Sequence, residues 1–111
     1  MLINIDPILG PEVLHTLRAM GHGDKLILCD SNFPAYSMNS VVHRLDGVDA
    51  AKAAKAILSI FPLDSFVEFP ILRMQIDNKP EELNDVHKEI IDVTRSVAGE
   101  NWKIGSIERF M

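Results

Sequence analysis

Segments with helical spacing and short apolar runs alternate along the sequence, and this alternation restricts the fold more than any other feature. Helices are predicted where apolar residues recur every three or four positions, and strands where apolar residues follow one another over a short run. In chain order, helices are predicted over residues 11–20, 48–61 and 80–98, and strands over 25–29, 41–45, 65–76 and 103–111. The order α, β, β, α, β, α, β predicts an α/β domain with a mixed sheet flanked by helices.

Single glycines and prolines separate the predicted elements. Pro11 stands where the first turn of a helix accepts proline, and Gly21 is expected to cap that helix at its C-terminal end. Gly99 is expected to end the last helix, and Pro70 places the third strand at a sheet edge or at a bulge. Residues 31–40 carry turn-forming residues around two aromatic side chains, which predicts a loop.

Length and charge exclude several classes of protein. No repeat or linker divides the 111 residues, so residues 1–111 are predicted to form a single domain. The net charge of -5 and the lack of a basic cluster argue against a nucleic-acid partner. No apolar run approaches the length of a membrane span, and no signal peptide is recognisable. The single cysteine, Cys29, cannot form an internal disulfide, which fits a reducing, cytoplasmic location, although a secreted protein without disulfides would look the same.

A histidine lies between two glycines in the tract MGHGD, residues 20–24. Glycine permits a positive φ and adds no side-chain bulk, so the imidazole of His22 is expected to be accessible to a ligand. The alternative is that His22 merely follows a helix cap. Asp24 is expected to have a structural role in the local turn, the alternative being that its carboxylate orients the imidazole.

Two aspartates and one arginine are further candidates for a binding site. Asp30 follows the predicted strand 25–29, at the end of a strand where ligands gather in an open α/β sheet. Asp64 lies where a predicted helix gives way to a predicted strand. For both aspartates the alternative role is to cap a turn. Arg109 could donate to hydroxyl groups or a carboxylate, or could lie on a solvated surface.

Other chemistries lack the spacing that they require. His15, His43 and His87 fall on separate predicted elements without an HxxxH or CxxC pattern, so no metal site is expected. No glycine-rich phosphate loop is present in the sequence. Cys29 lies within an apolar run and is predicted to be a buried thiol rather than a nucleophile.

Six tracts, taken in order, resemble the fucose mutarotase and ribose pyranase family, which is also called the RbsD/FucU family. They are MGHGD (20–24), the apolar run ending at Asp30, NFPAYSM (32–38), RLDG (44–47), PLDS (62–65) and IERF (107–110). The resemblance runs from the first predicted helix to the final residue and is closer to the fucose branch. It implies an RbsD-like α/β fold.

The resemblance also implies a function. It implies an isomerase that interconverts the α and β anomers of a free monosaccharide without a cofactor, with L-fucose as the first candidate and ribose pyranase activity as the second. It implies that His22 is the proton donor and that Asp30, Asp64 and Arg109 bind the sugar. A homo-oligomer is implied as well, and the 47% content of hydrophobic residues in so small a domain independently favours self-association.

The C-terminal end departs from the family pattern. Family members continue with a tyrosine-bearing segment, a helix and a final strand with a Tyr-Gly-Asn tract, whereas this chain ends at Met111 and has Tyr36 as its single tyrosine. We therefore expect either a longer natural protein or a second subunit that covers the last strand, and weak catalysis by the 111 residues alone. A non-catalytic sugar-binding or interaction protein is the alternative function.

Overall fold

A computed structural model of the chain describes residues 1–29, 35–38, 41–64, 69–74, 85–99 and 101–107. Within these ranges the elements are α1 (Pro11–Ala19), α2 (Ala35–Met38), α3 (Ala50–Leu58), β1 (Ile71–Met74), α4 (Asp85–Ala98) and β2 (Ile104–Ile107). Strands β1 and β2 pair in parallel, with Ile71 opposite Ile104 and Met74 opposite Ile107. The predicted α/β class is confirmed, and the described part of the sheet holds two parallel strands of the four predicted.

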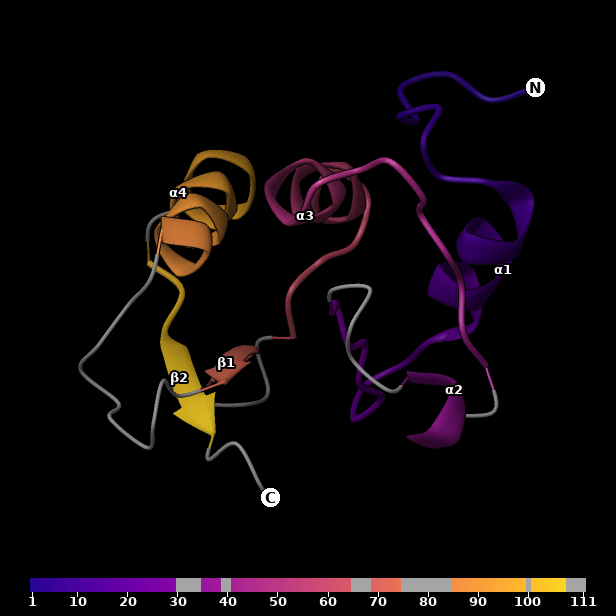
Figure 1. Cartoon of the computed structure of the whole chain (residues 1–111). Helices are drawn as coiled ribbons and strands as arrows, with labels where there is room; N and C mark the ends of the chain where they lie inside the picture. Colours follow the sequence, from indigo (N-terminus) through magenta and orange to yellow (C-terminus); the bar gives the residue numbers. More distant parts are fainter. Residues whose placement is uncertain (30–34, 39–40, 65–68, 75–84, 100, 108–111) are drawn as a thin grey trace.

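Helix α3 lies between α1 and α4 (Figure 1). Its sequence favours a helix because alanine has the highest helix propensity, and Asp49 caps it by accepting the backbone N–H of Lys52 over 2.7 Å. Helix α4 packs against α3. On α4 the fully buried Thr94 donates its hydroxyl to the carbonyl of Ile90 over 2.8 Å, so this buried polar group is satisfied.

A hydrophobic cluster joins α1 to α3. Its buried members are Leu9, Leu17, Ala56 and Ile57. Full burial of one large aliphatic side chain stabilises a fold by roughly 1.5–3 kcal/mol, so this cluster helps to hold α1 near α3. Met20, directly after α1, and Phe61, shortly after α3, pack against the same cluster. The cluster therefore fixes where the chain leaves both helices.

Two of the predicted strands are not strands. Residues 25–29 and 41–45 form no strand, and Leu26, Ile27 and Leu28 are 40%, 62% and 41% exposed. The thiol of Cys29, predicted to be buried, is exposed. An apolar run becomes a buried strand only when a neighbour takes its backbone hydrogen bonds and other elements cover its faces. Among the residues that the structure describes, none pairs with either run.

The ends of the helices were predicted in part. Gly99 has a φ of 113° directly after α4, which confirms its role as the residue that ends this helix. Gly21 does not cap α1, because Met20 follows the helix with an extended backbone and the positive φ falls on Gly23. The predicted loop 31–40 contains the short helix α2. None of the described helices is long and apolar enough to span a bilayer.

The structure describes β1, α4 and β2 over only part of their predicted ranges, and α3 is shorter than predicted. Strand β1 lies within 65–76 and β2 within 103–111, while residues 65–68, 75–84 and 108–111 fall outside the described part of the chain. Helix α3 ends at Leu58 rather than at Phe61, and Ser59 caps it. These differences leave the order of the confirmed elements unchanged.

The partly buried His87 on α4 predicts a pH dependence of stability. Burial lowers the pKa of His87, and the nearby positive charge of Arg73 lowers it further. Between the unfolded pKa of about 6.5 and the lower folded pKa, the unfolded chain binds more protons, so stability is highest above this window and is lost as the pH falls through it. We expect His87→Gln to reduce the acid sensitivity of urea unfolding. Equal pH dependence in the two proteins would contradict this prediction.

Candidate functional site

Residues 21–24 form a tight turn one residue after the end of α1. The backbone N–H of Asp24 donates to the carbonyl of Gly21 over 3.1 Å, with His22 and Gly23 between them. Gly23 has a φ of 89°, and a positive φ at the third of the four residues is what a type II turn requires. A Cβ on Gly23 would meet no atom within 4 Å, so the backbone conformation rather than lack of space calls for glycine here.

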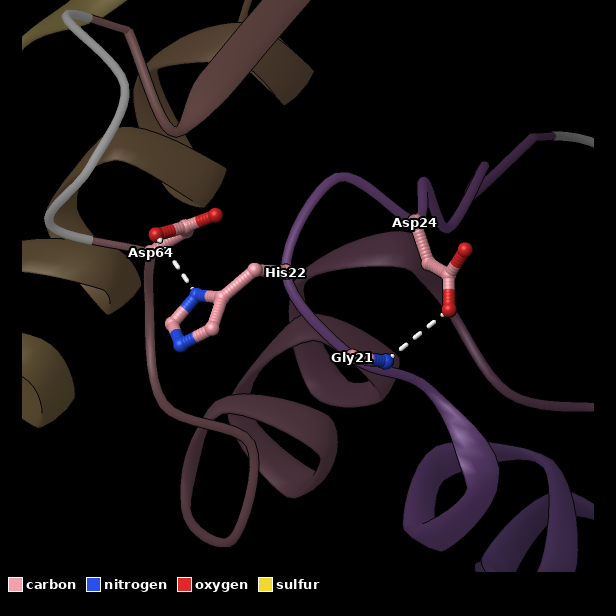
Figure 2. Close-up of polar contacts among 4 residues, drawn as sticks. All are labelled: Gly21, His22, Asp24 and Asp64. Carbon is pink, nitrogen blue, oxygen red and sulfur yellow. Dashed lines mark hydrogen bonds and ion pairs between the residues drawn. The ribbon is translucent and has the colours of Figure 1, made fainter.

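The Asp24 side chain reinforces this turn. Its Oδ2 accepts the backbone N–H of Gly21 over 2.9 Å, so both backbone polar groups of Gly21 bond to Asp24. Figure 2 shows the Asp24 carboxylate and the imidazole of His22 on opposite sides of the turn. The expected bonding of Asp24 within the local turn is therefore confirmed.

The imidazole of His22 points towards Asp64, which follows α3 (Figure 2). Nδ1 of His22 lies 3.0 Å from Oδ1 of Asp64, and the two residues are 42 positions apart in the sequence. The side chain of His22 is 71% exposed and that of Asp64 is 24% exposed. The pair thus lies at the surface, with the carboxylate more enclosed than the ring.

This contact determines how the ring can exchange protons. An ionised carboxylate only accepts hydrogen bonds, so Nδ1 must carry a proton to bond with Asp64. In the neutral ring, Nε2 then bears the lone pair, and in the charged ring Nε2 carries a second proton. Nε2 is therefore the atom of His22 through which a proton can pass to or from a bound molecule.

Of the four predicted site residues, the structure brings His22 and Asp64 together. Asp30 and Arg109 lie outside the described residues. Sequence reasoning considered Asp24 as a carboxylate that could orient the imidazole, but it is Asp64 that contacts the ring. No local pattern could have found this pair, because it depends on the packing of α1 against α3.

A shallow groove beside α1 is a separate feature. Thr16 and His43 line it, and their Oγ1 and Nε2 atoms lie 2.6 Å apart. Asp24 also lines this groove, whereas His22 and Asp64 do not. Within the described ranges, no group of three or more histidine, cysteine or acidic side chains is placed to hold a metal ion.

Comparison with known proteins shows the family of this chain. The model of the RbsD / FucU transport protein family matches residues 3–111. The chain belongs to the RbsD/FucU family. The resemblance predicted from the six sequence tracts is thereby confirmed.

Two curated RbsD/FucU relatives carry the same name. The L-fucose mutarotase of Actinobacillus pleuropneumoniae serotype 5b is 37% identical over 110 residues, which are 99% of this chain and 76% of the relative. The L-fucose mutarotase of Haemophilus influenzae strain 86-028NP is 36% identical over the same shares of both chains. Both of these L-fucose mutarotases are therefore similar to this chain over nearly its whole length.

A solved structure is similar in fold. The fucose mutarotase from Streptococcus pneumoniae in complex with L-fucose superposes with a TM-score of 0.85 and 29% identity, covering 97% of this chain and 76% of that chain. The RbsD/FucU fold expected from the sequence is thus confirmed by structure as well.

Replacing Asp64 tests the proposed link between the carboxylate and the ring. Asp64→Leu removes the acceptor of the Nδ1 proton, so we expect the neutral His22 ring to change from the Nδ1–H tautomer to a mixture of both. Ring ¹⁵N chemical shifts at a pH where the imidazole is neutral measure this change. His15, which is also exposed, provides an internal control in the same spectra. Identical His22 shifts in the two proteins would show that Asp64 does not set the tautomer.

Proposed function

We propose that this protein is a monosaccharide mutarotase, an isomerase that interconverts the α and β anomers of a free sugar, with L-fucose as its first substrate. One observation carries the proposal: an exposed imidazole is held at Nδ1 by a carboxylate, so that its Nε2 can exchange protons. The curated relatives named L-fucose mutarotase support the same reaction, since they align with 99% of this chain.

The reaction requires two proton transfers. To open a pyranose, one proton is placed on the ring oxygen and another is removed from the anomeric hydroxyl while the bond between the anomeric carbon and the ring oxygen breaks. The open chain then has a carbonyl group at that carbon. Closing the ring on the other face of the carbonyl reverses both transfers and gives the other anomer. Ring opening and closure change no oxidation state and conserve all atoms, so the reaction needs no oxidant, reductant or cofactor.

His22 is proposed to supply the proton for ring opening. The charged imidazole donates the Nε2 proton to the ring oxygen, while Asp64 keeps the Nδ1 proton in place. A second group, such as a water molecule at this exposed position, accepts the proton of the anomeric hydroxyl. General acid–base catalysis of this kind contributes about 10²- to 10⁴-fold.

Asp30, Asp64 and Arg109 are proposed to bind the sugar. Each oxygen of a carboxylate has two acceptor sites, so Asp64 can hold the Nδ1 proton and still accept from a sugar hydroxyl. The roles of Asp30 and Arg109 rest on the family resemblance, with hydroxyls donating to Asp30 and sugar oxygens accepting from the Arg109 guanidinium. These contacts would hold the reacting carbon against the imidazole.

A homo-oligomer and a cytoplasmic location remain predictions. The exposed side chains of Leu26, Ile27 and Leu28 support self-association, because a contiguous apolar surface is stabilised when a neighbouring molecule covers it.

Removing the imidazole tests the function directly. We expect His22→Ala to abolish catalysed anomer exchange because Nε2 is lost, and to leave the fold intact because the side chain lies outside the core. Saturation transfer between the anomeric protons of L-fucose, galactose and ribose measures the exchange rate and ranks the three sugars.

His15→Ala is the matched control, since His15 is an exposed histidine that lines the groove beside α1. Its exchange rate should equal that of the unchanged chain. Equal rates for His22→Ala and the unchanged chain would contradict the proton-donor role. Binding of L-fucose with no faster exchange would instead favour the non-catalytic sugar-binding function.

A further inference from the structure

We infer that Asp24 is a positioning residue for His22: its carboxylate holds the 21–24 turn in the conformation that directs the imidazole to Asp64. This inference rests on the proposed function, because it assigns Asp24 a part in the proton transfer made by His22. Asp24 does not touch the reacting atoms in this account. It acts through the backbone that carries the ring.

Two bonds from one residue define the turn. The Asp24 backbone donates to the Gly21 carbonyl over 3.1 Å, and the Asp24 carboxylate accepts from the Gly21 N–H over 2.9 Å. Both the N–H and the carbonyl of Gly21, the residue immediately before His22, are therefore bonded to Asp24. Loss of the carboxylate leaves the bond to the Gly21 carbonyl and frees the peptide between Met20 and Gly21, one residue before His22.

The exposure of His22 makes the turn important for its placement. A side chain that is 71% exposed has little surrounding packing to restrict its rotation or translation. The contact between Nδ1 and Oδ1 of Asp64 orients the ring only while the backbone of His22 stays in place. A displacement of about 1 Å in a catalytic group can reduce the rate by up to about 10²-fold, so a looser turn should lower the rate of the chemical step.

Asp49 provides a matched control elsewhere in the chain. Its carboxylate also accepts one backbone N–H, that of Lys52, over 2.7 Å, and both aspartates are exposed. Asp24→Ala and Asp49→Ala thus each remove one bond between a carboxylate and a backbone N–H. If Asp24 has a purely structural role, the two variants should have similar rates of anomer exchange. If Asp24 positions His22, only Asp24→Ala should lower that rate.

The first experiment compares kcat and KM for L-fucose anomer exchange in both variants, below their unfolding temperatures. We expect Asp24→Ala to lower kcat by about tenfold or more with little change in KM, and Asp49→Ala to stay within about twofold of the unchanged chain. Asp24→Asn should recover most of the loss, because its amide oxygen can still accept the Gly21 N–H. Full kcat in Asp24→Ala would overturn the inference.

The second experiment follows the ring itself and does not depend on activity. Ring ¹⁵N shifts of His22 should show loss of the fixed Nδ1–H tautomer in Asp24→Ala but not in Asp49→Ala. Gly23→Ala and Gly47→Ala form a second matched pair, since both glycines have a positive φ, 89° and 77°, with no atom within 4 Å of a Cβ. Only Gly23→Ala should alter the His22 shifts.

The two readouts separate failure of the inference from failure of the proposed function. Unchanged His22 ring shifts in both Asp24→Ala and Gly23→Ala would overturn the positioning role, whatever the rate of anomer exchange in these variants. If the unchanged chain exchanges no sugar, the proposed function fails, and altered shifts in these variants would still support the placement of His22 by Asp24.

Discussion

Packing between α1 and α3 is the constraint on which the candidate site depends. Leu17 from α1 and Ile57 from α3 belong to one buried cluster, and His22 and Asp64 leave these two helices shortly afterwards. Residues 42 positions apart meet at 3.0 Å because the helices that precede them are held together. A slide of one helix along the other would separate Nδ1 from Oδ1, so the core and the chemistry of the site are coupled.

In the proposed reaction, the contact between His22 and Asp64 matters for proton exchange more than for stability. Ion pairs at the surface contribute roughly 0–1 kcal/mol, and the ring of His22 is 71% exposed. What the carboxylate provides is a defined proton position, because a proton on Nδ1 makes Nε2 the exchanging atom. The turn that carries the ring is held by Asp24, so one acid fixes the backbone and another fixes the tautomer.

The sequence predicted features that depend on local chemistry and missed those that depend on distant partners. Pro11 and Gly99 correctly marked a helix start and a helix end. The roles that the family tracts give to His22 and Asp64 stay predictions, although the structure places the two side chains in contact. The run 25–29 was misjudged as a buried strand, because its residue pattern cannot say whether a neighbouring strand is there to pair with it. The pairing of His22 with Asp64 was missed for the same reason: it is set by helix packing.

A crystal structure of this protein with bound L-fucose tests the central claim most directly. The account predicts the sugar beside the 21–24 turn, with its ring oxygen at hydrogen-bond distance, about 2.6–3.2 Å, from Nε2 of His22. It also predicts that Nδ1 remains in contact with Asp64. A sugar bound in the groove beside Thr16 and His43, with nothing bound against His22, would contradict the account.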